Sequence, residues 1–264
     1  MSELVEQLLS SNPEIRHAAL AAAVGTTDSS VVEILVARLA DAKFAEPERQ
    51  LAAEAVSKSS LPEIAAILLP ELAGESAFTR TMAAMALGGQ RSAEAVAALV
   101  EGLTDPVNTV RNWSERSLLG MIPAVQKYGI EALIGLLVHH VALSRSPAAR
   151  LLGLTRDERA LGPLLRMAQD DPEWLSRMGA IKALGDLGIS DAIDVVKKLL
   201  QADPKNRVRA AAAESLGKLR PADAESVLRS VLSTDEDDGV QKMAGEALRS
   251  LGFDVTDIND EGWE

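Results

Sequence analysis

A repeat with a nearly constant period constrains the fold of this chain more than any other feature of its sequence. The segment DPVNTVRNWSERSLLG at 105–120 has a near copy, DPKNRVRAAAAESLGKL, at 203–219. An arginine that often follows valine anchors the register, and it recurs every 31 to 34 residues. The anchoring positions are Arg16, Arg49, Arg80, Arg111, Arg145, Arg177 and Arg209, with Gln241 in the last copy. Such a register is typical of a repeat array, in which each unit packs only against its neighbours.

The sequence of each repeat unit predicts a pair of helices. The Asp-Pro pairs at 105–106, 171–172 and 203–204 predict an N-cap followed by proline at the first helical position. A glycine that follows the last aliphatic residue, as in Leu184-Gly185, predicts the left-handed residue that ends this first helix. Apolar residues three and four apart predict the second helices, which we expect at 31–40, 61–72, 93–103, 131–141, 159–168, 192–200 and 222–232.

No segment alternates with a period of two for long enough to indicate a strand. The sequence therefore predicts an all-α protein. We expect an α-solenoid of about eight helical hairpins of 31–34 residues, forming one right-handed superhelix over 1–252. An acidic C-terminal tail at 253–264 would follow it. Frequent alanine lets helices approach closely, which accounts for a composition that is 47% hydrophobic but only 3% aromatic.

The pattern Asp-Pro-x-x-x-Val-Arg-x-x-Ala-x-x-x-Leu-Gly, followed by Asp-Ala and a Leu-rich helix, resembles the HEAT repeat. Its short, Ala-rich form is similar to the repeats of phycobilisome lyases and related bacterial HEAT-like proteins. The resemblance covers roughly residues 3–252. It implies that each periodic arginine bridges to an aspartate of a neighbouring repeat. It implies little about function, because this repeat serves scaffolds, inhibitors, lyases and a few enzymes.

Composition excludes several classes of function. The chain has no cysteine, which excludes disulfides, thiolate catalysis and cysteine-ligated metals. Its net charge of −12 argues against a nucleic-acid partner, because phosphate binding needs a concentrated basic surface. The N-terminus has no basic leader, and no run reaches the roughly 18 apolar residues of a membrane span. We expect a cytoplasmic protein without a membrane partner.

The middle third of the chain differs from its flanks in charge and in aromatic content. Residues 105–182 hold 10 Lys and Arg against 8 Asp and Glu, a net of +2, whereas 1–104 and 183–264 each have a net of −7. Tryptophan, tyrosine and arginine are enriched at interaction hot spots. We therefore expect partner- or ligand-binding residues here: Trp113, Arg116, Tyr128, His139, His140, Arg150, Arg159 and Trp174.

These candidates also have structural interpretations. Trp113 is equally well explained as packing between repeats or as an exposed anchor, whereas Trp174 follows an Asp-Pro turn and favours contact with a partner. His139 and His140 fall near the end of a predicted helix, where neighbouring side chains point about 100° apart. They cannot both face one metal ion from a single stripe, so a buried or helix-terminal role is favoured over metal binding.

Three enzyme classes built on such repeats can be weighed against these residues. The HEAT-like deoxyhypusine hydroxylases hold iron with several His-Glu pairs, and none of the three histidines here is followed by glutamate. The HEAT-like DNA alkylation glycosylases need a continuous basic groove, which this acidic chain lacks. The bilin lyases and phycobilisome-degradation proteins match best in repeat style.

The expected function is a non-enzymatic scaffold with no metal or cofactor. It would bind another protein on the concave face, which we expect the second helices to form, around repeats four to six. The alternative is a bilin lyase or a phycobilisome assembly or degradation factor that binds a phycobilin. Its partner would be a phycobiliprotein or a second HEAT-like chain.

Overall fold

The computed structural model describes residues 2–255. These residues form seventeen α-helices, two single-turn 3-10 helices and no strand, which confirms the all-α prediction. The chain divides into two compact units, unit 1 at 1–132 and unit 2 at 133–264, and the border falls within α10 (Ile130–Leu136). The single superhelix and its hand remain predictions. Of the predicted acidic tail, residues 256–264 lie outside the described part of the chain.

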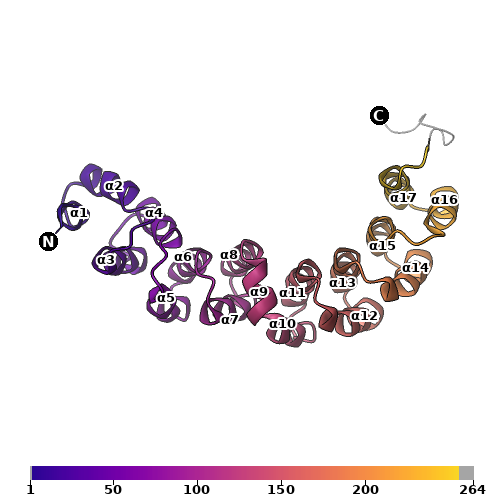
Figure 1. Ribbon diagram of the computed structural model, residues 1–264, viewed down its shortest axis with the longest axis horizontal. Helices are drawn as coiled ribbons and strands as arrows, with labels where there is room; N and C mark the ends of the chain where they lie inside the picture. The colour runs from indigo at the N-terminus through magenta and orange to yellow at the C-terminus, as the bar shows by residue number, and fades with distance from the viewer. Residues whose placement is uncertain (1, 256–264) are drawn as a thin grey trace. The chain divides into compact units, whose positions relative to one another are not determined.

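Within each unit the helices form two rows (Figure 1). One row, here called the Arg row, contains the periodic arginines. In unit 1 it consists of α2 (Pro13–Ala22), α4 (Glu46–Ser57), α6 (Ala77–Leu87) and α8 (Asn108–Leu119). In unit 2 it consists of α11 (Ala142–Thr155), α13 (Trp174–Leu187), α15 (Asn206–Leu219) and α17 (Asp238–Leu251).

The other row, here called the second row, contains the helices that alternate with these along the chain. In unit 1 these are α1 (Glu3–Leu8), α3 (Ser29–Ala40), α5 (Ile64–Leu72), α7 (Ala93–Gly102) and α9 (Ile122–Tyr128). In unit 2 they are α12 (Leu161–Asp170), α14 (Ile193–Ala202) and α16 (Ala224–Thr234), and the turns η1 (Glu158–Ala160) and η2 (Ser190–Ala192) lead into α12 and α14. The helix predicted over 131–141 is present but shorter than predicted, because α10 ends at residue 136.

Small residues bring successive helices of the Arg row together. An ideal Cβ placed on Gly153 of α11 would lie 2.7 Å from the Cα of Ala183 on α13. A Cβ on Gly185 of α13 would lie 2.8 Å from the Cβ of Ser215 on α15. Any side chain at these glycines would force the helices apart, since such packed interfaces leave no free volume.

These glycines correct one prediction. Gly153 and Gly185 lie inside their helices, which continue to residues 155 and 187. The left-handed residues that end these helices are Arg156, with φ of 55°, and Gly188, with φ of 75°. The repeated glycine of unit 2 is therefore there for close helix approach and not for capping.

The Asp-Pro pairs also play a different role from the one predicted. Helix α13 begins at Trp174 and α15 at Asn206, after the prolines. Asp171 Oδ1 accepts a hydrogen bond from the backbone N–H of Glu173 at 2.9 Å, which makes a turn ahead of the helix. The aspartates thus shape the loop that leads into each helix rather than capping the helix itself.

The two rows differ in spacing, and this decides how each unit curves. Neighbouring helices of the Arg row pack tightly, whereas neighbouring helices of the second row, such as α12 and α14, are splayed. Each unit, taken by itself, therefore bends toward its Arg row, which lies on the inner side of the curve (Figure 1). The expectation that second helices form the concave face is wrong, because the small residues that allow close approach are on the first helices.

Candidate functional site

The periodic arginines connect successive repeats, as the resemblance implied. In unit 2, Arg177 on α13 donates to Asp203 in the loop before α15, with Nε–Oδ2 at 2.8 Å and Nη2–Oδ1 at 3.1 Å. Its Nη1 donates to the carbonyl oxygen of Asp171 at the start of its own repeat, at 3.0 Å. Arg177 therefore holds two Asp-Pro loops at once. The contact of a periodic arginine with a carboxylate of the next repeat is here called a rung.

The same rung recurs along both units. It is formed by Arg80 with Asp105, Arg145 with Asp171, and Arg209 with Asp235, at 2.7 to 2.8 Å. Near the N-terminus Arg16 pairs instead with Glu48, which Arg38 also contacts. Arg49 donates to the hydroxyl of Thr79 at 2.8 Å, and Gln241 donates to the carbonyl oxygen of Asp235 at 2.7 Å. The structural interpretation is confirmed for these arginines, whereas Arg111 donates to the carbonyl oxygens of Asp105 and Pro106 and to Asn108, all in its own repeat.

Asp235 and Glu48 show how a contact with a periodic arginine favours the ionised form of a carboxylate. Hydrogen bonds from Arg209 are the largest cause that lowers the pKa of Asp235, and burial partly opposes them. The hydrogen bond from Arg16 likewise lowers the pKa of Glu48, again against burial. The Asp235 and Glu48 carboxylates are therefore ionised and engaged at neutral pH, which suits packing between repeats.

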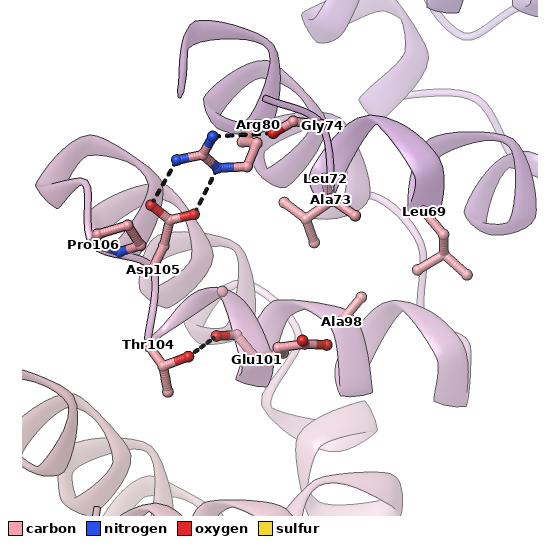
Figure 2. Close-up of a pocket in the computed structure, with 11 residues that line it drawn as sticks. Leu69, Leu72, Ala73, Gly74, Arg80, Ala98, Glu101, Thr104, Asp105 and Pro106 are labelled. Atoms are coloured by element: carbon pink, nitrogen blue, oxygen red, sulfur yellow. Dashed lines mark hydrogen bonds and ion pairs between the residues drawn. The ribbon is translucent and has the colours of Figure 1, made fainter. Parts of the chain in front are cut away.

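Grooves open above three of the rungs, where second-row helices splay apart. Figure 2 shows the groove of about 530 Å³ between α5 and α7, with the pair of Arg80 and Asp105 at its edge. There Thr104 donates to the carbonyl oxygen of Glu101, and Arg80 also donates to that of Gly74. Two grooves of about 550 Å³ in unit 2 lie above Arg145 and Arg209 in the same way.

One of these three grooves has walls that are far more apolar than those of the other two. It lies beside α10 and α12 in unit 2, and Ile134, Leu137, Val138 and Met167 line it together with Arg166. The side chain of Val138 is 86% exposed. The other two grooves are more polar, so the recurring shape by itself does not define a ligand, and the lining of each groove decides what it can hold.

The predicted binding residues are divided between the two units. In unit 1, Trp113 of α8 is half-buried, and the guanidinium of Arg116, one turn further on, stacks on its ring with Cζ 4.8 Å from the centroid. Tyr128 at the end of α9 is exposed and has the ammonium of Lys127 4.8 Å from its ring centroid. These two pairs are local, since each joins residues close in the sequence.

In unit 2, His139 and His140 lie in the loop after α10, with ring centroids 4.3 Å apart. Their placement at a helix end is therefore wrong. His139 Nδ1 accepts from the N–H of Val141 at 3.3 Å, and its carbonyl oxygen accepts from Arg145 at 2.9 Å. Arg145 is the arginine of the first rung of this unit, so His139 supports that rung through its carbonyl oxygen. Across residues 2–255 no group of three or more His, Asp or Glu side chains could hold a metal ion.

The remaining arginine candidates are exposed. Arg150 lies on α11, five residues after the rung arginine Arg145. Arg159 lies in η1 and forms a local ion pair with Asp157 at 2.8 Å. Because that pair is exposed and spans only two residues, it contributes little to stability.

Trp174 is the predicted candidate whose ring lies beside charged side chains of the following repeat. It is the half-buried first residue of α13. The ammonium of Lys205 and the guanidinium of Arg207 lie 5.3 and 5.7 Å from the centroid of its ring. We call Trp174, Lys205 and Arg207 the Trp174 cluster. Sequence reasoning missed the two cations, although their offset of about one repeat from the tryptophan is the signal that could have found them.

Other exposed residues of the Arg row extend this surface. Leu143 and Leu175 precede their rung arginines by two residues, as Arg207 does, and Leu143 is exposed while Leu175 is half-buried. Arg150 and Lys182 each follow their rung arginine by five residues and are exposed. The Arg-row side of unit 2 thus carries both apolar and cationic groups at equivalent repeat positions.

The comparisons with known proteins agree with this architecture. The chain matches the family described as HEAT repeats over residues 130–217 and 197–258, and that described as PBS lyase HEAT-like repeat over 79–105. The fold and the rungs show the same repeat along both units. The chain is a HEAT-like repeat protein of the PBS lyase HEAT-like type, as its sequence predicted.

Several solved structures share the fold at low sequence identity. The Escherichia coli protein YibA is 20% identical with a TM-score of 0.51, over 95% of this chain and 91% of that one. The complex of CpcE and CpcF of phycocyanin lyase from a Nostoc species is 20% identical with a TM-score of 0.53, over 59% of this chain and 99% of that one.

A chain in the structure of Kap95p bound to RanGDP is 13% identical with a TM-score of 0.63, over 94% of this chain and 39% of that one. No curated protein matches the chain. Of the helices described, none is both long enough and apolar enough to cross a membrane. The similarities to solved structures therefore concern the fold alone.

Proposed function

We propose that this protein is a non-enzymatic interaction scaffold that binds an acidic segment of a partner protein on the Arg-row side of unit 2. The observation that carries the proposal is the Trp174 cluster, in which two cations share one indole ring at 5.3 and 5.7 Å. HEAT-like repeats are built to present long surfaces to other proteins, and this supports the class of function.

Electrostatics favour a carboxylate at this cluster. Lys205 and Arg207 carry like charges beside the same ring, so a carboxylate placed between them relieves their repulsion and forms charge-assisted hydrogen bonds. The cluster also lies at the N-terminal ends of α13 and α15, where the helix dipole adds positive potential. The loop aspartates Asp171 and Asp203 are already engaged by their rungs.

The neighbouring apolar residues indicate what else the segment carries. Leu143, Leu175 and Met178 lie on the same side of α11 and α13 and are at least partly exposed. Aliphatic side chains of a bound segment would cover them, while its acidic side chains reach the cations. Tryptophan surrounded by such groups is the kind of anchor on which binding energy concentrates.

A peptide-display selection tests the proposal. A random dodecapeptide library is selected on the full chain and on a Trp174→Ala/Arg207→Ala variant. Peptides rich in Asp and Glu with a few aliphatic residues should be enriched on the full chain and bind the variant about tenfold or more weakly. The variant should keep its melting temperature within a few degrees, because all three side chains of the cluster are at least partly exposed.

Two results would contradict the proposal. Selection of peptides without acidic residues would show that the bound segment is not acidic. Equal binding of acidic peptides to both proteins would place the site elsewhere. As a matched control, Arg220→Ala changes another exposed cation of unit 2, at the far end of α15, and should leave the affinity of the selected peptides unchanged.

The alternative function is the handling of a bilin, and the apolar groove beside α10 and α12 is the observation that favours it. Its walls suit the rings of a tetrapyrrole, and Arg166 at its edge suits a propionate, although Asp170 and Asp171 also line it. Adding phycocyanobilin and recording the visible spectrum tests this alternative. A shifted band that Arg166→Ala weakens would support it, and an unchanged spectrum would reject it.

A further inference from the structure

The four Arg-row helices of unit 2 begin at equivalent repeat positions, so the residues over their starts can be compared one by one. Helices α11, α13, α15 and α17 follow one another in this row (Figure 1). The five residues over each start lie 32 residues after those of the helix before, and we call them the start segments: HHVAL at 139–143, DPEWL at 171–175, DPKNR at 203–207 and DEDDG at 235–239.

The start segments change from apolar to cationic and then to acidic along the row. The first two end on leucines, Leu143 and Leu175, which are exposed and half-buried respectively. The third contains two exposed cations, Lys205 and Arg207. The fourth contains four acidic residues and no cation. Of the four start segments, the third is therefore the one with unpaired positive charge to offer a ligand.

The two cations of the third start segment face α13 rather than α17. Lys205 Nζ and Arg207 Cζ lie 5.3 and 5.7 Å from the ring centroid of Trp174, and across residues 2–255 neither side chain forms an ion pair. Asn206, which lies between them in the sequence, turns the other way, and its Nδ2 donates to Asp237 Oδ2 at 2.6 Å. The positive charge is thus held on the α13 side of α15.

Acidic side chains border this positive charge on both sides. On the α17 side, Glu236 has a side chain that is 90% exposed, and Asp238 is exposed as well. The hydrogen bond from Asn206 lowers the pKa of Asp237, which is therefore ionised at neutral pH. On the α13 side, Glu173 is exposed. A carboxylate of a bound segment is attracted at the third start segment and repelled at the fourth, where like charges meet.

We propose that the acidic partner segment lies across the starts of α11, α13 and α15, with its aliphatic residues on α11 and α13 and its acidic residues grouped at the α15 end. The inference rests on the proposed function and adds the order in which the segment carries its apolar and acidic residues. The segment does not continue over α17, because the fourth start segment repels its carboxylates.

The spacing of the helices sets the spacing of residues in the segment. Packed helices lie about 8–10 Å apart, so α11 and α15 are roughly 16–20 Å apart. An extended chain advances about 3.3 Å per residue and covers this distance in about five or six residues. Peptides of about twelve residues are not stable helices in water, so the segment binds in an extended form. Its aliphatic residues and its carboxylates therefore follow one another at steps of about three residues.

Designed peptides of one composition test the order. The ordered peptide carries a leucine, a second leucine and a pair of glutamates, each separated from the next by two serine or glycine residues. It is made in both chain directions, because the order of side chains does not fix the direction of the backbone. In the mixed peptide the glutamates lie between the leucines. In one direction the ordered peptide should bind the full chain at least about tenfold more tightly than the mixed peptide, measured by fluorescence anisotropy.

A variant of the fourth start segment tests the acidic border at α17. A longer peptide continues the ordered one with further glutamates beyond the pair, and it should bind the unmodified chain more weakly than the ordered peptide does. Glu236→Gln/Asp238→Asn should raise the affinity of this longer peptide about fivefold or more. Asp194→Asn/Glu246→Gln removes the same charge at two other exposed acids of unit 2 and should change that affinity less than about twofold.

The outcomes separate the order of the segment from the proposed function. Equal binding of the ordered and mixed peptides, with both weakened by Trp174→Ala/Arg207→Ala, would overturn the order and leave the proposed function standing. The order would also be wrong if none of the designed peptides binds while acidic peptides selected by display do. A longer peptide that binds as tightly as the ordered one would show that the fourth start segment does not limit the site.

Discussion

Arg177 joins two repeats of unit 2, because its Nε and Nη2 both donate to the Asp203 carboxylate while its Nη1 donates to the carbonyl oxygen of Asp171 in the loop of its own repeat. The Asp171 carboxylate in turn forms an ion pair with Arg145, with Nε–Oδ2 at 2.7 Å. Each Asp-Pro loop is therefore held from two sides, by the arginine before it through its carboxylate and by the arginine after it through its carbonyl oxygen.

Removal of one rung should destabilise unit 2 markedly. Arg177→Ala leaves the Asp203 carboxylate, whose side chain is 2% exposed, without its ion-pair partner. We expect a loss of about 2–4 kcal/mol in the free energy of unfolding, measured by urea denaturation, because an uncompensated buried charge is costly. Arg159→Ala breaks the exposed local pair with Asp157 and should cost less than about 1 kcal/mol. Equal losses in the two variants would show that the rungs do not hold the repeats.

Because of the rung of Arg209, the stability of the folded chain should fall as the pH becomes acidic. Its hydrogen bonds lower the pKa of Asp235 from the ordinary value of 3.8, so the folded state favours the ionised carboxylate. The stabilisation is therefore complete above the unfolded-state pKa and is lost as the pH falls through the folded-state pKa. Asp235→Asn should melt well below the unmodified chain at pH 7, and the difference should shrink toward pH 3. A difference that stays constant from pH 7 to pH 3 would contradict this linkage.

The glycine inside α11 should tolerate no side chain. A Cβ at Gly153 would approach both the Cα and the carbonyl oxygen of Ala183 to 2.7 Å, and this backbone cannot rotate away as a side chain could. Gly153→Ala should lower the free energy of unfolding by about 1–3 kcal/mol. Gly162→Ala on α12 meets only the end of the Arg166 side chain, at 3.7 Å, and should be neutral or stabilising by up to about 1 kcal/mol. If both variants gain stability, the close approach of α11 and α13 is not a constraint.

Much of the fold could be predicted because the buried positions recur with the period of the repeat. Each Arg-row helix needs an apolar side toward its neighbours, and this need recurs at the same positions in every repeat. The spacing of Arg177 and Asp203 follows from the same period, and the resemblance to HEAT repeats predicted the contact between them. The candidate site was predicted only in part, since Trp174 was found from its residue type and Lys205 and Arg207 were not.

The sequence by itself determined the all-α class, the repeat register and the arginines that join the repeats, because these depend on a periodic pattern of side chains along the chain. The tertiary structure alone decided where the helices end, which row lies on the inner side of each unit, and which side chains surround Trp174. The reason is that one residue type serves two physical needs. Glycine permits both a left-handed backbone and a close helix approach, and Gly188 and Gly185 show one of each. Only the distance to the neighbouring helix distinguishes them.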